Sequence, residues 1–191
     1  QSPSAANDYV IPDLVGTPTI VVGSTNSVKS ISSVERLQLA SGTWTISNSS
    51  SLLAGIDISG GTLTLSSGST LIVSGNSSWT GIAQVNGLGT FRNEGTLRFA
   101  TTSIRAIPSR FENLGTLINQ GTELGSVLLI NSPSVFENYA SGVIDLDYSG
   151  SNPTPISSLG NLSWGTFINA GTIKKSNSIA TAVVNVPVIM N

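Results

Sequence analysis

The chain has 191 residues, of which 9% are charged, and its formal net charge is −2. It contains no histidine and no cysteine, which excludes nucleophilic triads built on those residues, disulfides and thiolate metal sites. There is no basic cluster and no apolar run of membrane-spanning length, so neither nucleic acid nor a bilayer is an expected partner. Because charged residues usually make up roughly a quarter of a soluble domain, the surface must consist mainly of Ser, Thr, Asn and Gly. This composition favours an extracellular, secreted or cell-surface protein.

The first segment, residues 1–18, contains three prolines and is expected to form an extended N-terminal arm or cap. Its polar opening without a signal peptide is consistent with a mature secreted chain. The first strands are expected at 19–23 and 28–31, so the regular architecture is predicted to begin at residue 19.

A repeat becomes visible from residue 37. Residues 37–47 align with residues 56–66 at an offset of 19, and Trp44 then coincides with Leu63. Apolar residues alternate with polar or small ones in both segments, which is typical of a strand buried on one face. Trp44 is therefore expected in the core. The threonines beside it would form an outward array in only two coils, too few for an ice-binding face.

The C-terminal half repeats a clearer phrase: an aromatic residue, any residue, an asparagine, and then a glycine before the next strand. The four copies begin Phe91-Arg92-Asn93, Phe111-Glu112-Asn113, Phe136-Glu137-Asn138 and Phe167-Ile168-Asn169, and their glycines are Gly95, Gly115, Gly142 and Gly171. If Trp44 and Leu63 are equivalent to these phenylalanines, the repeat is 19 to 31 residues long. Units this short cannot bury their own apolar face and must stack on one another.

The phrase predicts an all-β fold: a single-domain parallel β-helix (β-solenoid) of about six or seven coils over residues 19–175, with extended terminal arms. At about 4.8 Å per coil, the rod would be about 30–35 Å long. The asparagines should point inward and form a ladder with turn backbone and with each other. The alternative role for these asparagines is ligand binding. The glycines of the phrase should supply turn conformations that are costly for other residues. The ladder residues are Asn93, Asn113, Asn138 and Asn169.

The residues between aromatic and asparagine should point outward in one column. This column contains Arg92, Glu112, Glu137 and Ile168, and it predicts an exposed Arg92–Glu112 pair one coil apart. Such a pair contributes at most about 1 kcal/mol to stability. A binding groove is the functional alternative for the column.

Two further groups are candidate sites. Asp145 and Asp147 share one face of a strand and are the candidate metal ligands, which could bind Ca²⁺ together with Ser149. Trp79 and Trp164 lie in polar, loop-like contexts, where they could stack on sugar rings or anchor loops against the solenoid wall. Three N-glycosylation sequons begin at Asn48, Asn76 and Asn161.

The last segment, residues 176–191, carries no charge. It alternates apolar residues, namely Val184, Val186, Val188 and Met190. An uncharged apolar strand at a sheet edge promotes association unless something covers it. We therefore expect a strand that either caps its own solenoid or pairs with a neighbouring subunit.

The phrases Gly89-Thr-Phe-Arg-Asn-Glu-Gly-Thr-Leu97 and Gly165-Thr-Phe-Ile-Asn-Ala-Gly-Thr-Ile173 resemble repeats of right-handed β-helical surface proteins. The resemblance is to bacterial autotransporter and haemagglutinin-type passenger domains and to the β-helical heads of fungal wall adhesins, and it covers roughly residues 37–175. It implies adhesion, surface display or scaffolding. The chain departs from the fungal heads in lacking cysteine, and from long passengers in having few coils.

Scattered carboxylates without His or Cys provide poorly for catalysis, so we expect a non-enzymatic protein. The leading hypothesis is an extracellular structural or adhesive surface protein that self-associates through its ends into a homo-oligomer or filament. The alternative is a carbohydrate-binding module or polysaccharide-active β-helix that contacts a surface glycan through the two tryptophans and two aspartates named above. No cofactor is expected apart from that Ca²⁺.

Overall fold

The computed structural model describes residues 4, 6–16, 18–101, 105–120, 128–147, 156–157, 164–176 and 181–191. Throughout this part of the chain the regular elements are β-strands, and the strands pair in parallel into stacked coils. The expected all-β parallel solenoid is therefore confirmed.

Each turn of the solenoid contributes one strand to each of three faces. Sheet A is the first face and contains β1 (Asp8–Ile11), β4 (Ser30–Ser33), β7 (Ser50–Leu52), β10 (Thr70–Val73), β13 (Thr90–Asn93), β16 (Arg110–Asn113), β19 (Val135–Asn138), β22 (Thr166–Asn169) and β25 (Val188–Met190). Sheet B is the second and contains β2 (Thr19–Val22), β5 (Arg36–Leu39), β8 (Ile56–Ile58), β11 (Asn76–Gly81), β14 (Thr96–Thr101), β17 (Thr116–Asn119), β20 (Val143–Asp145) and β23 (Thr172–Lys174).

The third face consists of two shorter sheets that follow one another along the rod. Sheet C contains β3 (Asn26–Val28), β6 (Thr43–Ile46), β9 (Thr62–Leu65) and β12 (Gln84–Gly87). Sheet D contains β15 (Arg105–Ala106), β18 (Leu128–Leu129), β21 (Ile156–Ser157) and β24 (Val184–Asn185). Strand β12 lies beside β15, so the third face continues from sheet C into sheet D.

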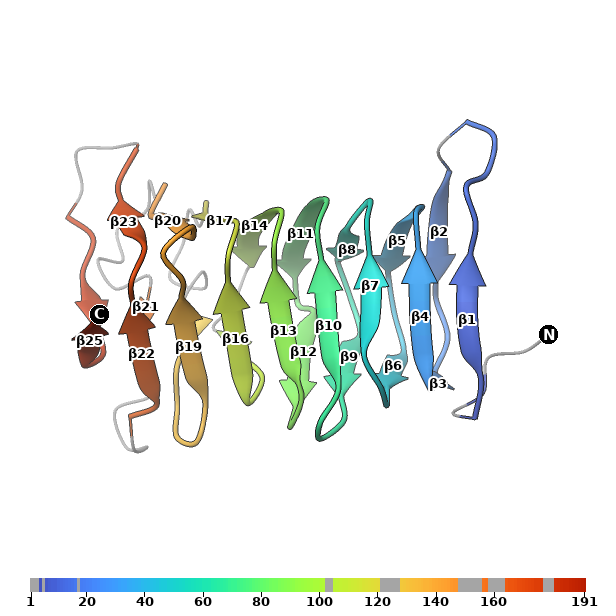
Figure 1. The fold of residues 1–191 in the computed structure, drawn as a ribbon, viewed down its shortest axis with the longest axis horizontal. Coiled ribbons are helices and arrows are strands. Elements are labelled where there is room, and N and C mark those ends of the chain that lie inside the picture. The colour runs from blue at the N-terminus through green and yellow to red at the C-terminus, as the bar shows by residue number, and fades with distance from the viewer. Residues whose placement is uncertain are drawn as a thin grey trace.

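The first and last strands of sheet A, β1 and β25, lie at opposite ends of the rod (Figure 1). The solenoid has about eight turns, more than the six or seven expected. The difference comes from the termini: β1 lies within residues 1–18 and pairs with β4, while β24 and β25 lie within residues 176–191 and pair with β21 and β22. Eight turns at about 4.8 Å give a rod of roughly 40 Å.

The core consists of inward side chains that stack in columns, one per turn. In sheet A the rings of Phe91, Phe111, Phe136 and Phe167 follow one another with centroids 5.0 to 5.4 Å apart, the outer two pairs stacked and the Phe111–Phe136 pair edge-on, and each ring is at most 1% exposed. Aromatic pairs at this spacing add about 0.5–1.5 kcal/mol beyond the area that they bury.

The expected equivalence of Trp44 and Leu63 with these phenylalanines is wrong. Both residues lie in sheet C and pair with each other there, whereas the column of Phe91 continues upstream through Leu71 and Ser50 in sheet A. The offset of 19 between the two upstream segments is correct, and Trp44 is buried as expected.

The asparagine ladder is present as expected. Asn93 donates from Nδ2 to Asn113 Oδ1 (2.8 Å), Asn113 to Asn138 (2.7 Å), and Asn138 to Asn169 (2.7 Å). The donor amides also reach backbone carbonyls at the start of the next coil's sheet B strand, for example Asn93 Nδ2 to Thr116 O (3.1 Å). All four side chains are buried, so their bonds are made inside the solenoid and not to a ligand.

The glycines of the phrase are required for a different reason from the expected one. None of the four has a backbone φ in the left-handed region. A Cβ at Gly115 would instead lie 2.1 Å from the carbonyl oxygen of Gly95, and one at Gly95 would lie 2.2 Å from that of Gly75. Close stacking of successive turns, and not turn dihedral angles, therefore excludes a side chain there.

Candidate functional site

The outward column predicted from the phrase exists on sheet A, where Arg92, Glu112, Glu137 and Ile168 are register neighbours. Glu112 accepts from Arg92 Nε at 2.6 Å and from Arg110 Nε at 2.7 Å, and Arg110 also reaches Glu137. Burial opposes ionisation of Glu112, but the bonds from Arg110 and Arg92 outweigh it and lower the pKa of this carboxyl. We call Arg92, Arg110, Glu112 and Glu137 the sheet A clasp. Their ion pairs connect three successive turns.

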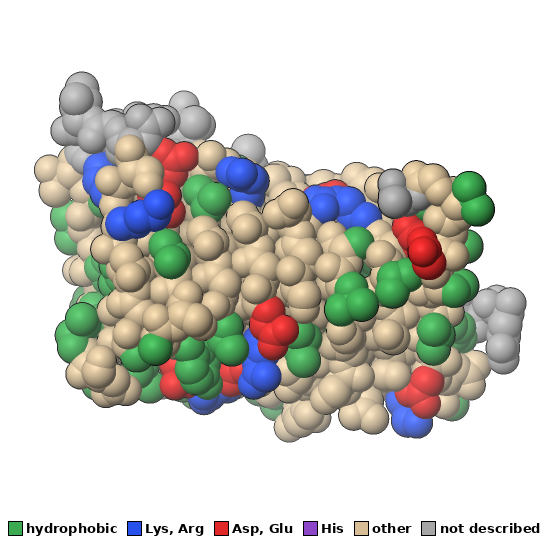
Figure 2. Space-filling model, turned by 45° about the horizontal axis from the view of Figure 1, so that its top comes forward, with side chains coloured by type: hydrophobic (Ala, Val, Ile, Leu, Met, Phe, Trp, Pro, Cys, Tyr) green, Lys and Arg blue, Asp and Glu red, His purple; other side chains and the backbone are tan. Residues whose placement is uncertain are grey.

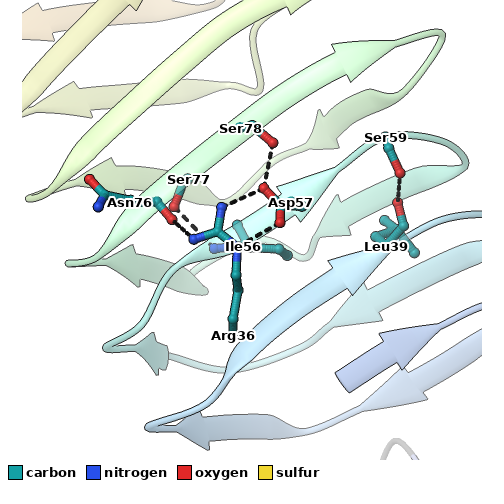
Figure 3. Close-up of polar contacts among 8 residues, drawn as sticks. All are labelled: Arg36, Leu39, Ile56, Asp57, Ser59, Asn76, Ser77 and Ser78. Atoms are coloured by element: carbon teal, nitrogen blue, oxygen red, sulfur yellow. Dashed lines mark hydrogen bonds and ion pairs between the residues drawn. The ribbon is translucent and has the colours of Figure 1, made fainter. Parts of the chain in front are cut away.

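A second clasp lies on sheet B, nearer the N-terminus (Figure 3). Arg36 of β5 donates from Nε and Nη2 to the two oxygens of Asp57 on β8, both at 2.6 Å, and from Nη1 to the carbonyl of Asn76 at the start of β11. Ser78 also donates to Asp57. Burial opposes the ionisation of Asp57, but Arg36 and Ser78 together lower its pKa. The cluster again spans three turns.

In both clasps, the charged side chains form ion pairs with other side chains of the same chain. Further pairs join Lys29 to Asp8 (2.8 Å) and Lys174 to Asp145 (3.2 Å), each across one turn. Figure 2 shows the result on one face: charged side chains form small groups of both signs, separated by a wide uncharged surface. These carboxylates already bind cations of the same chain, so they are poor candidates for acid–base chemistry.

The proposed calcium ligands have other partners. Asp145 accepts from the Ser176 backbone N (3.0 Å), Ser176 Oγ (2.6 Å) and Lys174, while Asp147 accepts from Gln120 Nε2 (3.0 Å). Burial opposes ionisation of Asp145, but the bonds from Ser176 and Lys174 lower its pKa. Ser149 lies outside the described residues. Within the described residues, no three or more His, Cys, Asp or Glu side chains form a group that could hold a metal ion.

The loop-like context expected for Trp79 is not found, and of the two roles considered for this side chain the structure does not allow stacking on a sugar ring. Trp79 belongs to β11, is 1% exposed, donates from Nε1 to Ala83 O (2.9 Å) and packs edge-on against Phe99 at 5.3 Å. Trp164 is 49% exposed and forms an isolated antiparallel bridge with Asn131. Of the two tryptophans, only Trp164 presents a surface on which a ligand could stack.

The N-terminal end of the solenoid is open. The inward side chains of β1 and β2 are only partly buried, whereas their counterparts in the inner turns are covered. A cavity of about 310 Å³ opens there, and its lining includes Tyr9, Ile11, Ile20, Val22, Val28 and Trp44. Sequence reasoning missed this site because it treated residues 1–18 as an arm; the alternation of Tyr9 and Ile11 was the available signal.

The C-terminal end is open as well. Val184 and Val188 are partly buried against the last core layer, Val186 is 7% exposed, and Met190 is 70% exposed. Strand β25 pairs with β22 of the same molecule, so the terminal strand does cover its own solenoid. Its other edge has no partner strand in the described part of the chain.

Comparison with known proteins gives no relative: no family model, no curated protein and no solved structure matches the chain. Within the described residues, no helix has the length and apolar character needed to cross a membrane.

Proposed function

We propose that this protein is a non-enzymatic, extracellular structural or adhesive protein that assembles with copies of itself through the two ends of its solenoid. The observation that carries the proposal is the distribution of incompletely covered core residues. Among the residues that the structure describes, every apolar side chain that packs against the core while remaining partly exposed belongs to the first or the last turn: Tyr9, Ile11, Ile20, Val22, Ile173, Ala182, Val184 and Val188.

Both ends combine an exposed sheet edge with apolar side chains. Val10 and Val21 are 75% and 59% exposed at one end, and Ile189 and Met190 are 50% and 70% exposed at the other. Edge strands in monomeric proteins are normally protected by charges, bulges or covering segments. Strand β25 carries no charge, and the only charged residue of β1, Asp8, is paired with Lys29. These features favour pairing with another strand.

The extracellular setting and the surface role rest on composition and on the repeat phrase. The surface carries few charges, several of them are paired within the chain, and the phrase resembles the repeats of passenger domains and wall adhesins. A rod of stacked coils with few charges is suited to building a surface structure or to displaying an adhesive surface, and it provides few groups for catalysis.

A matched pair of substitutions tests assembly through the ends. Ile189→Lys places a charge on the open edge of β25, whereas Ile82→Lys places the same charge at a residue that is 72% exposed in the middle of the rod. We expect Ile189→Lys to weaken self-association at least about tenfold, which corresponds to about 1.4 kcal/mol, and Ile82→Lys to leave it unchanged. Size-exclusion chromatography with light scattering over a concentration series measures both; equal assembly of the two variants would contradict the proposal.

Point substitution is a better test than deletion of residues 176–191. Because β24 and β25 pair with β21 and β22, deletion would uncover the turn beneath them and create a new open end.

The exposed ring of Trp164 supports a second candidate function, recognition of a neutral surface glycan. A glycan array followed by Trp164→Ala tests it. Loss of a specific signal in the variant would support sugar binding, and an array without specific signals would rule against it.

A further inference from the structure

The three faces of the solenoid do not have the same number of strands. Within the residues that the structure describes, sheet A has nine strands and sheet B has eight, while the third face has four in sheet C and four in sheet D. The first and the last of these strands, β1 and β25, both belong to sheet A, so the ninth layer of the described residues consists of β25 alone. If β1 of one copy paired with β25 of another, one layer would be missing on the two other faces.

Removal of one sheet A strand from the junction makes all three faces continuous. When β25 occupies the place of β1 on a second copy, β2 and β3 of that copy complete the layer of β25. Sheet B then continues from β23 to β2, and the third face continues from β24 to β3. On the basis of the proposed self-assembly, we propose that copies join by strand exchange: β25 of one copy displaces β1 of the next and pairs in parallel with its β4. Exchange of one element between copies is a low-cost route to association.

The inward side chains remain matched after the exchange. Within one chain, Tyr9 of β1 lies beside Ile31 of β4, and Val188 of β25 takes this place in the same inward column. On sheet B, Ile173 of β23 comes to lie beside Ile20 of β2, and each is only partly buried at its own end of the rod. The exchange therefore replaces one strand pairing, adds two others and buries further apolar surface, which favours association.

Strand β1 covers the core less completely than β25 does. Its inward residues Tyr9 and Ile11 are only partly buried, and they line the N-terminal cavity of about 310 Å³. Removal of β25 would uncover Phe167 and Asn169, which are 0% and 2% exposed. Removal of β1 uncovers Ile31, which already lines the cavity. Strand β1 is therefore the one that leaves at the lower cost in free energy.

The side chains that fasten β1 lie at the surface. Asp8 pairs with Lys29 at 2.8 Å through side chains that are 52% and 45% exposed, and Ser30 also donates to Asp8. Such exposed contacts contribute little. Leu14 N donates to Glu35 Oε1 at 2.6 Å, but this bond lies beyond the end of β1 and does not have to break. Strand β1 is thus held mainly by its pairing with β4, which β25 can replace.

A reversible disulfide tests whether β1 must leave, since the chain contains no cysteine of its own. Val10 of β1 and Ser32 of β4 are outward neighbours in register. Paired strands lie about 4.8 Å apart, within the Cα separation that a disulfide spans. In the double variant Val10→Cys/Ser32→Cys, oxidation holds β1 on β4 and reduction releases it. The matched control is Ser51→Cys/Ile72→Cys, which locks β7 to β10 on the same face.

We expect oxidation of the β1 lock to weaken self-association at least about tenfold, which corresponds to about 1.4 kcal/mol, and reduction to restore it. The control lock should assemble equally in both redox states. Light scattering over a concentration series measures both variants, and circular dichroism checks that they fold. Equal assembly of the oxidised and reduced β1 lock would overturn the exchange while leaving self-assembly intact. If the unmodified protein stays monomeric, the proposed function itself fails.

Cross-linking between copies identifies the strand that replaces β1. After the exchange, Ile189 of one copy lies beside Ser32 of the next, in the place that Val10 occupied. Single variants Ile189→Cys and Ser32→Cys, mixed under mild oxidation, should therefore give cross-linked dimers. Ile189→Cys mixed with Val10→Cys should give at least about tenfold less product, because the displaced strand is no longer held within the roughly 7 Å that a disulfide requires. Efficient cross-linking of Val10→Cys with Ile168→Cys would show that β25 leaves instead, and would overturn the proposal.

Discussion

At the scale of single residues, Glu112 is the centre of the sheet A clasp. Its side chain is 7% exposed and accepts hydrogen bonds from Arg92 of the preceding turn and from Arg110 of its own strand, whose side chains are 35% and 40% exposed. An ion pair on an open surface contributes little, but a largely buried carboxylate with two charge-assisted bonds contributes more. The expectation of a simple exposed pair therefore understated this site, because Arg110 was not recognised as a member.

We expect Glu112→Gln to lower the free energy of unfolding by about 1–3 kcal/mol, since two arginines lose their charged acceptor and the amide cannot replace it. Glu94→Gln is the control: Glu94 is exposed, and its side chain meets Ser74 Oγ at 3.3 Å. Its effect should stay within about 0.5 kcal/mol. Urea unfolding followed by circular dichroism measures both; similar values for the two variants would show that the clasp does not stabilise the rod.

The clasps also predict acid sensitivity. The pKa values of Glu112, Asp57 and Asp145 are lowered in the folded state, so these groups stabilise the fold at pH values above their unfolded pKa. That contribution disappears as the pH falls through the folded pKa. The melting temperature should therefore stay nearly constant from pH 7 to about 5 and fall steeply below about pH 4. A thermal melt series that is flat to pH 3 would contradict this.

At the scale of the repeated element, three features hold one turn on the next: the close contact of their backbones at the glycines, the columns of inward side chains, and the asparagine ladder. The ladder has a direction: each amide donates toward the C-terminal end. Asn93 is the first member, and its Oδ1 has no hydrogen-bond donor in the described part of the chain. The preceding position in its column is Val73, so the ladder begins at the boundary with an apolar column.

The glycine column yields the sharpest test at this scale. Gly115→Ala would place a Cβ 2.1 Å from the Gly95 carbonyl oxygen, whereas the nearest atom to a Cβ at Gly23 is Ser41 Oγ at 3.8 Å. We expect Gly115→Ala to destabilise the protein by at least about 2 kcal/mol, because two turns must separate, and Gly23→Ala to change stability by less than about 0.5 kcal/mol. Thermal melts of both variants decide; a tolerated Gly115→Ala would mean that the turns can move apart easily.

The positions that repeat in each turn could be predicted from the sequence, but the face of the solenoid to which each strand belongs could not. Alternation identified inward residues, so the Phe column, the ladder and the outward position of Glu112 were predictable. Three strands per turn share the same alternation, however, and Trp44 was therefore assigned to the face of Phe91. The polar neighbours of Trp79 suggested a loop, and its burial against Phe99 became evident only from strand pairing. Arg36 and Asp57 are 21 residues apart, about one turn, a signal that went unused.

At the scale of the whole molecule, the protein is a short rod with covered sides and two open ends. The sides carry a mostly uncharged surface with small groups of charged side chains and scattered exposed apolar residues (Figure 2), whereas the ends expose core layers and strand edges. A subunit whose ends are covered only by another copy gains stability from association. The proposed function thus follows from where the apolar surface lies, and not from any reactive group.

Electron microscopy of the purified protein over a concentration series tests the proposed end-to-end assembly most directly. We expect particles of constant width whose lengths are multiples of roughly 40 Å, eight turns of about 4.8 Å each, and whose mean length increases with concentration. Single rods of roughly 40 Å at every concentration, or particles that widen by side-to-side contact, would contradict it.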